Sequence, residues 1–416
     1  MTALAVNVSS RILQAFFGSV SGLPRTFWFL WTGSLINRVG SFVMPMLAVY
    51  LTKERNLTLV EAGTVVSLFG FGGLTSVQIG GVLADRFGRK GTMLLALTTS
   101  AATMLALGFA ATTAQLGVAA FALGFTTSLY HAPSQAMLAD IVPPGDRQRA
   151  FGLLYWAINL GFAIAALLGG QLAKWSFTGL FLIDAASTTA TALLLWRTLP
   201  ETKPAPSPEG EERGGSLLTP FFDLTYLPFL FVHMLLILVF FQFQVALPAD
   251  MASKGLDSGD LGLVMALNGV MIVALQPWVT RKIQGWRRSR SLALAALCVG
   301  FGFGANAFAT GLGTFAIGIA IWTMGEIIMA PVNSSIVADL SPADMRGRYQ
   351  GAFALMWSIG MTTGPWLSGM IITATNTRTL WFGCVVGGAL AAFGHLLLGG
   401  ARKRRLEALG VQPARD

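Results

Sequence analysis

Long apolar segments, separated by short polar ones, recur along the whole chain. Each is close to the length of about 20 residues that a helix needs to cross the hydrocarbon core of a bilayer. The pattern predicts twelve membrane-spanning helices, at about 27–52, 62–83, 92–112, 115–139, 151–173, 177–196, 227–249, 260–280, 291–309, 313–337, 350–372 and 379–399. Alternate connections are very short, which leaves helical hairpins and no room for an extracellular domain.

Polar and glycine positions repeat without a gap at an offset of 199 residues, as Asp140 and Asp339 illustrate. The matched pairs are Ala139 and Ala338, Asp140 and Asp339, Pro143 and Pro342, Arg147 and Arg346, Arg149 and Arg348, Gly152 and Gly351, Gly161 and Gly360, and Gly170 and Gly369. The matched residues set helix ends, charged loops and close helix packing. The chain is therefore predicted to form two pseudo-symmetric six-helix bundles, as membrane transporters commonly do, with a substrate path between the halves.

Composition excludes the main alternative, a large soluble protein. Hydrophobic residues make up 54% of the chain, charged residues 11%, and the mean hydropathy is +0.65. A soluble domain carries about 25% charged residues, because its surface must be covered. The expected fold class is an all-α membrane protein, with bundles at 27–198 and 226–400.

Basic residues are distributed by topology. Most of the 28 lysines and arginines fall in one alternate set of connections and in the terminal segments. The positive-inside rule places this set, and both termini, in the cytoplasm. The net charge of +9 is thus mostly topological, and no basic, aromatic-rich domain indicates nucleic-acid binding. Compact loops and the absence of targeting elements favour a bacterial inner membrane.

The segments outside the bundles have their own compositions. Residues 1–26 hold a short apolar run behind Arg11, which favours an interfacial helix over a cleaved signal peptide. Residues 199–225 are rich in Pro, Gly and Glu and are predicted to form a flexible linker, and residues 401–416 form a basic tail. The two cysteines lie in apolar spans and are expected to be buried, without a disulfide or metal site.

The connection after the second span reads Gly81-Val82-Leu83-Ala84-Asp85-Arg86-Phe87-Gly88-Arg89-Lys90. Gly81 allows helices to approach closely, Gly88 permits a tight turn, and Asp85 is a carboxylate suited to a helix N-terminus. The segment resembles the signature of the major facilitator superfamily over ten consecutive positions. The resemblance covers nearly the whole chain and implies a twelve-helix transporter fold.

In that family the loop acts as a latch between the halves in the outward-open state. The resemblance implies that Asp85 docks on the eleventh span, and that Asp140 and Arg149 join Arg86 and Arg89 in a charge network. The simpler alternative is an anchor that only fixes topology. The equivalent segment at 281–290 keeps basic charge but lacks the acid and the glycine spacing, which predicts a one-sided latch.

Two glycine-rich spans correspond to each other. The eleventh carries Gly360, Gly364, Pro365 and Gly369, and resembles an antiporter-type pattern of the same family. The fifth keeps the outer glycines, Gly161 and Gly170, but has Ala-Ala at the position of Gly-Pro, which weakens the case for antiport. Small residues at this spacing favour close helix packing, and a proline can bend its helix.

Three charged residues lie inside predicted spans: Arg38, Asp184 and Glu326. Each costs about 2.5–3.5 kcal/mol at a helix centre unless it is paired or faces water. One cation and two acids cannot pair fully, so one carboxyl is free to carry a proton. Glu326 is the first candidate and Asp184 the second, with Arg38 as counter-ion. Asp184 has an equally supported alternative as a capping acid near its span end.

Other polar and aromatic residues extend a candidate substrate cavity, namely Asn37, His131, Gln242, Gln244, Asn268 and Phe241. His131 is a candidate proton relay, with an interhelical hydrogen bond as the alternative. The run from Trp322 to Pro331 resembles the tenth span of multidrug efflux members of the superfamily. Aromatic walls suit flat lipophilic compounds, cationic ones among them, which burial and cation–π contacts would hold.

The chain has no P-loop and no catalytic constellation, so neither ATP nor a cofactor is expected to drive it, and it is not expected to be an enzyme. The favoured hypothesis is a monomeric exporter of small lipophilic compounds, driven by the proton gradient through antiport. A proton symporter that takes up a small anionic metabolite remains open, because Arg38 could bind an anion. A transporter-like sensor or scaffold is the third alternative.

Overall fold

The structure is a computed structural model that describes residues 22–143, 146–202, 218–283, 285–342 and 345–408. These residues are helical almost throughout, and no strand occurs among them. Within this part of the chain, ten helical stretches are long and apolar enough to cross a membrane. The predicted N-terminal interfacial helix and most of the predicted linker lie outside the described residues.

The first half of the described chain comprises seven long or medium α-helices, a short α-helix and a π-helical turn. They are α2 (Arg25–Val39), α3 (Val43–Val49), η1 (Tyr50–Glu54), α4 (Leu59–Phe87), α5 (Arg89–Phe109), α6 (Thr113–Leu129), α7 (His131–Ile141), α8 (Arg147–Leu172) and α9 (Phe177–Thr198).

The second half has a related series of helices, begins with the short helix α10 and ends in α18, which overlaps the predicted basic tail. Its elements are α10 (Thr219–Phe222), α11 (Tyr226–Phe240), η3 (Phe241–Phe243), α12 (Ala246–Ser253), α13 (Ser258–Ile283), α14 (Arg288–Gly304), η4 (Ala305–Phe308), α15 (Leu312–Leu340), α16 (Arg346–Ala374), α17 (Thr377–Leu397) and α18 (Gly399–Ala408).

Polar residues begin several of these helices. Thr58 accepts a hydrogen bond from the Glu61 N–H, and the Glu61 carboxylate accepts one from the Thr58 N–H, which is a complete capping box at the start of α4. Thr112 and Gln115 do the same for α6. These caps satisfy N–H groups that would otherwise lack partners, and so fix where the apolar runs start.

Three predicted spans are interrupted. The first breaks between α2 and α3 at residues 40–42, and the seventh breaks at η3. The first interruption includes Phe42 and the second includes Phe241, its repeat partner. The fourth divides at Tyr130 between α6 and α7, just before Pro133, whose missing N–H removes a helical hydrogen bond. The predicted span at 115–139 is therefore two helices, and neither α6–α7 nor α16 is among the ten stretches above.

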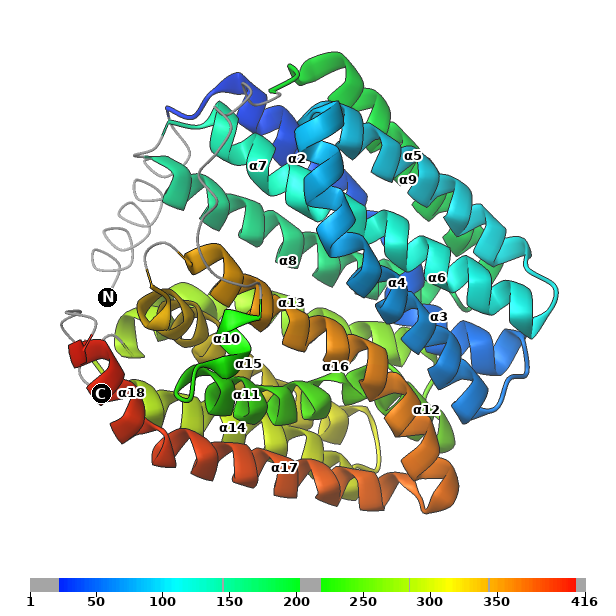
Figure 1. Cartoon of the computed structure of the whole chain (residues 1–416). Helices are drawn as coiled ribbons and strands as arrows, with labels where there is room; N and C mark the ends of the chain where they lie inside the picture. Colours follow the sequence, from blue (N-terminus) through cyan, green and yellow to red (C-terminus); the bar gives the residue numbers. More distant parts are fainter. Residues whose placement is uncertain (1–21, 144–145, 203–217, 284, 343–344, 409–416) are drawn as a thin grey trace, which may run out of the picture.

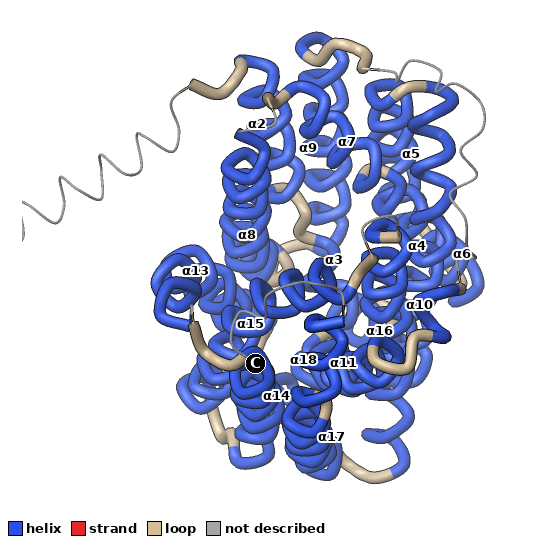
Figure 2. The backbone as a smooth tube through the Cα atoms, turned by 60° about the vertical axis from the view of Figure 1, so that its left-hand side comes forward, coloured by secondary structure: helices blue, strands red, loops and turns tan. Residues whose placement is uncertain are grey.

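The helices of residues 25–198 lie together above those of residues 219–408 in Figure 1. Two crossings join the groups, α4 with α16 and α8 with α13, and Figure 2 shows them on opposite sides of the molecule. Within each crossing the helices meet near one end. Figure 1 shows α4 and α16 diverging from the Leu59 end of α4 towards Phe87 and Arg346.

Glycines permit both crossings. A Cβ on Gly63 would lie 2.5 Å from the Pro365 carbonyl oxygen, and one on Gly369 would lie 2.6 Å from the Leu59 carbonyl oxygen. In the other crossing, Gly262 meets the Ala166 carbonyl. Gly262 is the repeat partner of Gly63, and Ala166 is the repeat partner of Pro365, each at the offset of 199. The same pair of positions therefore meets in both crossings, once with the glycine in the first half and once with the glycine in the second, so the crossings are pseudo-symmetric.

An ion pair reinforces the same end of the molecule. Lys174, which follows α8, lies 2.8 Å from the Asp257 carboxylate, which precedes α13. The Asp257 carboxylate also accepts hydrogen bonds from the N–H groups of Gly259 and Asp260. The first and second groups of helices are thus held together at the ends of α8 and α13 that meet.

Candidate functional site

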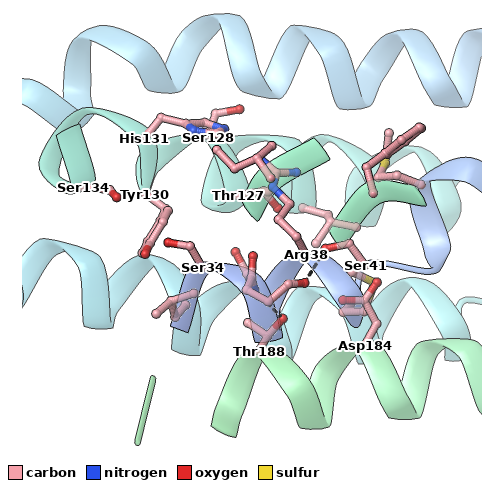
Figure 3. A pocket seen from close by; sticks show the side chains of 18 of the residues that line it. Ser34, Arg38, Ser41, Thr127, Ser128, Tyr130, His131, Ser134, Asp184 and Thr188 are labelled. Atoms are coloured by element: carbon pink, nitrogen blue, oxygen red, sulfur yellow. Dashed lines mark hydrogen bonds between the residues drawn. The ribbon is translucent and has the colours of Figure 1, made fainter. Parts of the chain in front are cut away.

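A cavity of about 300 Å³ lies among α2, α5, α6, α7, α8 and α9. The second half of the chain contributes Phe243, Gln244 and Met361 to its wall. The lining is mixed, with hydroxyl and amide groups on α2, α6, α7 and α9 and apolar side chains on α5, α6 and α8. Figure 3 shows the polar side of this cavity.

Arg38 lines the cavity from the last turn of α2. Its turn is fixed by close packing with α8, because a Cβ on Gly161 would lie 2.5 Å from the Arg38 Cβ. In Figure 3 the side chain extends towards the side on which Thr127 and His131 lie, away from Asp184. The ion pairs of the described residues do not include Arg38.

Asp184 lines the same cavity from α9 and is 2% exposed. Its Oδ2 accepts a hydrogen bond of 3.3 Å from the backbone N–H of Val43, the first residue of α3. The carboxylate therefore caps the helix that resumes after the break in the first span, where N–H groups lack helical partners. This contact is the one expected of the capping alternative for Asp184.

Three of the predicted cavity residues line the cavity: Asn37, His131 and Gln244. The Asn37 amide donates a hydrogen bond of 3.1 Å to the Thr188 hydroxyl. The Gln244 Oε1 is buried and has no hydrogen-bond partner among the described residues. This acceptor is available to a bound molecule.

Gln242 and Phe241 lie beside the cavity, in the packing of α16. The Gln242 Oε1 accepts 2.7 Å from the Ser368 hydroxyl, and its Nε2 donates to the Leu238 carbonyl oxygen at 2.8 Å. Phe241 fills the space above Gly360 and Gly364. These contacts satisfy the glutamine and explain both glycines as packing residues.

Glu326 occupies a different place from Arg38 and Asp184. It lies on α15, partly exposed, and accepts a hydrogen bond of 2.9 Å from the Asn268 amide, which also donates to the Thr323 hydroxyl at 3.0 Å. The Tyr155 phenol of α8 lies close to Glu326 and to Gln276. Glu326 does not line the cavity described above, so the predicted carboxyls form two separate groups.

The predicted latch loop contains an ion pair and a cap. Arg89 Nε lies 2.9 Å from Asp140 Oδ2. Gly88 has φ of +92°, in the region that favours glycine, and a Cβ there would collide with the Glu201 carboxylate. Glu201 accepts hydrogen bonds from the N–H groups of Lys90 and Gly91, and so caps α5.

The other latch residues divide between described and undescribed side chains. Arg86 is exposed in the last turn of α4. Gly81 and Asp85 are helical positions of α4, and Arg149 is a helical position of α8, but their surroundings lie outside the part that the structure describes. The proposed docking of Asp85 on α16 therefore stays a prediction.

The second half holds an ion pair equivalent to that of the loop. Arg288 Nη1 lies 2.6 Å from Asp339 Oδ2, and both residues follow Arg89 and Asp140 by 199 positions. The comparison of local motifs missed it, because the second loop lacks the glycines and the acid of the first. The signal was present in the repeat itself, where Asp140 recurs as Asp339.

Two further acids were not predicted, the partly buried Asp223 and the fully buried Asp250. Asp223, before α11, accepts from the Tyr349 hydroxyl at 2.8 Å and pairs with Arg405 of α18 at 3.3 Å. Asp250 of α12 is fully buried, pairs with Lys254 at 2.9 Å and accepts from the Trp381 indole at 2.8 Å. Both flank the ends of the predicted seventh span, so a search for charges inside spans did not find them.

The remaining packing predictions concern α8 and α16. Gly170 meets the Ser258 carbonyl and Gly262 across the α8–α13 crossing, and Gly369 is its counterpart in α16. Pro365 lies within α16, which continues on both sides of it. Among the described residues no group of three His, Cys, Asp or Glu side chains could hold a metal ion.

Among the described residues, a helical membrane architecture with a polar-lined cavity whose wall includes residues of both halves is typical of membrane transporters. The chain matches the family model described as Major Facilitator Superfamily over residues 30–325 and 229–414. It therefore belongs to this superfamily. Its relatives in the superfamily are transporters and not enzymes.

Relatives and solved structures agree with this assignment. The chain is 26% identical over 396 residues to a Na(+), Li(+), K(+)/H(+) antiporter of Planococcus maritimus, covering 85% of this chain and 91% of that protein. It is 24% identical over 375 residues to the multidrug resistance protein MdtH of Aeromonas salmonicida (strain A449), covering 85% and 93%. The structure of a POT family transporter in complex with 5-aminolevulinic acid gives a TM-score of 0.79 at 15% identity, covering 92% and 97%, which shows the fold alone.

Proposed function

We propose that this protein is a twelve-helix, two-bundle exporter that exchanges protons for small lipophilic compounds by alternating access. The observation that carries the proposal is the cavity, because side chains of both halves form its wall. A ligand there contacts both halves at once, so a rocking motion of one half against the other changes its access. We propose that the transporter works as a monomer in a bacterial inner membrane.

The direction in which the cavity faces follows from charge and packing. The diverging end of α4 carries Arg86 and leads to Arg89 and Lys90 at the start of α5, and the positive-inside rule assigns this end to the cytoplasm. The glycine crossings and the Lys174–Asp257 pair then close the outer end. In this assignment the structure represents the inward-facing state, which loads an exported compound.

Glu326 is the proposed proton carrier. It is partly exposed, hydrogen-bonded to Asn268, and no ion pair of the described residues includes it. A carboxylate within a membrane helix is costly without a cation. Binding or release of a proton at Glu326 therefore changes the relative energies of the inward-facing and outward-facing states. Its neighbour Tyr155 belongs to the other half, and this supports a role for Glu326 at the boundary between the halves.

The named relatives support proton antiport. One is called a cation/proton antiporter and another a multidrug resistance protein, both with more than four fifths of this chain aligned. A second candidate, proton-coupled uptake of an anionic metabolite, is favoured by Arg38, whose charge enters the cavity without an ion pair among the described residues.

The test uses inverted membrane vesicles that contain the full chain and a fluorescent lipophilic dye. An exporter concentrates the dye inside these vesicles when their lumen is acid, and it releases lumenal protons when dye is added. We expect Glu326→Gln to abolish both while the protein stays folded. Glu54→Gln, at an exposed carboxyl, is the matched control. Undiminished proton-driven accumulation in Glu326→Gln overturns the role of Glu326, and dye movement in the opposite direction favours uptake.

A further inference from the structure

The cavity has an uneven distribution of charge. Of the described residues that line it, Arg38 is the one strong base and Asp184 the one carboxylic acid. The Asp184 carboxylate already accepts a hydrogen bond within the protein, since its Oδ2 caps the N-terminus of α3 through the Val43 N–H. Arg38 extends to the opposite side, and it forms no ion pair with a described carboxylate.

From this arrangement we infer the class of compound that the cavity takes, an amphipathic monoanion with one carboxylate or similar group on a compact apolar body. The inference rests on the proposed function, because it assumes that this cavity is the transport site. It goes further in naming the charge of the ligand and the way it lies. A guanidinium inside a membrane protein is stabilised by an anion that forms charge-assisted hydrogen bonds with its planar donors.

The groups beside Arg38 fit an anion. Thr127, Ser128 and His131 line the side towards which Arg38 extends, and all three side chains can donate a hydrogen bond. Carboxylate oxygens have about four acceptor sites, more than one guanidinium uses. A ligand carboxylate on Arg38 therefore has further donors within the same part of the cavity.

The rest of the wall fits an apolar body. Met104, Leu123 and Phe162 line it from the first half, and Phe243 and Met361 from the second. With its anionic group on α2 and its body against these second-half residues, one ligand spans the boundary between the halves. Binding then depends on both halves holding their relative position, as alternating access requires.

The experiment measures binding and does not require transport. The purified full chain, in an uncharged detergent near neutral pH, is titrated with three matched probes: 2-naphthoate, 2-naphthalenemethanol and 2-naphthylmethylammonium. Because hydrogen bonds to charged groups contribute more than neutral ones, we expect 2-naphthoate to bind about 10-fold or more tightly than the alcohol, and the ammonium probe to bind most weakly.

Variants assign the preference to its residue. Arg38→Gln is expected to lower the affinity for 2-naphthoate to that of the alcohol, whose affinity stays unchanged. Arg38→Lys keeps the charge and is expected to retain part of the preference, which serves if Arg38→Gln does not fold. Lys53→Gln, at an exposed lysine outside the cavity, is expected to change nothing, and Phe243→Ala to weaken 2-naphthoate and the alcohol alike.

Three outcomes overturn the inference: equal binding of the three probes, preference for the ammonium probe, or an anion preference that survives in Arg38→Gln. Its failure is separable from that of the proposed function. Proton-driven export of neutral or cationic dyes by the native protein, without a binding preference for 2-naphthoate, would leave antiport standing and reject the anionic class. An anion preference with no proton coupling through Glu326 would support the anionic class and reject proton antiport through Glu326.

Discussion

Arg288 and Asp339 form in the second half the ion pair that Arg89 and Asp140 form in the first. The distances are 2.6 Å and 2.9 Å. The first-half pair joins the start of α5 to the end of α7, and the second-half pair joins the start of α14 to the end of α15. The arginines are 13% exposed in both pairs and the aspartates about one third exposed. The repeat therefore preserves a tertiary contact even where the surrounding loop sequence has changed.

This equivalence predicts matched effects of mutation. Asp140→Asn and Asp339→Asn should each lower the stability of the detergent-solubilised protein by about 1 kcal/mol, since the pairs are partly screened. A double-mutant cycle of Arg288→Gln and Asp339→Asn, measured by thermal denaturation, should show coupling, whereas Arg290→Gln, at an exposed arginine, should not couple to Asp339→Asn. Absence of coupling in the first cycle would show that the contact between Arg288 and Asp339 does not contribute to stability.

The Asp223 cluster predicts a dependence on pH. Burial raises the pKa of the Asp223 carboxyl, but hydrogen bonds from Tyr349 and the backbone N–H groups of Thr225 and Tyr226, together with Arg405, outweigh burial and hold the pKa below its usual value. A lowered pKa stabilises the folded state above the usual value and loses this effect as the pH falls through the lowered one. Asp223→Asn should therefore be less stable than the native protein at pH 7.

The measurement is the difference in apparent melting temperature between native protein and Asp223→Asn across a pH series. The difference should stay constant from about pH 8 to pH 5 and begin to shrink below about pH 4, where the carboxyl of the unfolded chain gains its proton, and it should be lost as the pH falls through the lower pKa of the native carboxyl. Tyr349→Phe should reproduce part of the loss at neutral pH. A difference that is the same at acid and neutral pH would show that the charge of Asp223 does not matter.

The glycine crossings predict a shift in conformation. Gly262→Val introduces atoms against the Ala166 carbonyl and should weaken closure at that end of the molecule. Ser67→Cys, whose native hydroxyl accepts a hydrogen bond of 3.1 Å from the Trp366 N–H in the other crossing, reports access there. The thiol introduced by Ser67→Cys should react slowly with a membrane-impermeant maleimide in the single variant, and faster in the variant that also carries Gly262→Val.

The control for this labelling is Gly383→Val, at a glycine where an added Cβ meets nothing within 4 Å. It should leave the labelling rate unchanged. Both experiments use a background in which Cys298 and Cys384 are replaced by alanine. Equal labelling in the Gly262→Val and Gly383→Val proteins would mean that the crossings do not control access at this end.

The contact between Asp184 and Val43 predicts which substitutions of Asp184 are tolerated. Asparagine keeps an oxygen that accepts the Val43 N–H, whereas alanine leaves the start of α3 without its cap. We expect Asp184→Ala to lower stability by about 0.5–2 kcal/mol, in the range of lost helix caps, and Asp184→Asn to lower it less. Thermal denaturation of both variants checks the order. A stable Asp184→Asn protein that has lost proton coupling would instead assign Asp184 to the proton path.

The hydrophobic pattern was sufficient to predict an all-helical membrane protein, because span length is set by bilayer thickness and by the need to satisfy backbone polar groups within the helix. It did not predict the break at η3, which depends on how α11 and α12 pack against α16. The tight turn at Gly88 was predictable, since only a glycine is unstrained at its φ of +92°.

The candidate site was predicted in composition but not in arrangement. Arg38 and Asp184 line one cavity, yet they do not pair, and Glu326 lies elsewhere beside Asn268. Gln242 was expected in the cavity, but its amide is satisfied by Ser368. A sequence shows that a polar group lies within an apolar helix. It does not show the direction in which that group points.

The sequence by itself determined the membrane class, the superfamily and the repeat, because each depends on residue type and on distance along the chain. The tertiary structure decided which charges meet, as for Arg288 and Asp339, and which charge is left facing the cavity, as for Arg38. These outcomes depend on the rotation and crossing of helices far apart in the chain. Packing of small residues such as Gly161 and Gly262 against neighbouring helices sets that geometry, and no local pattern specifies it.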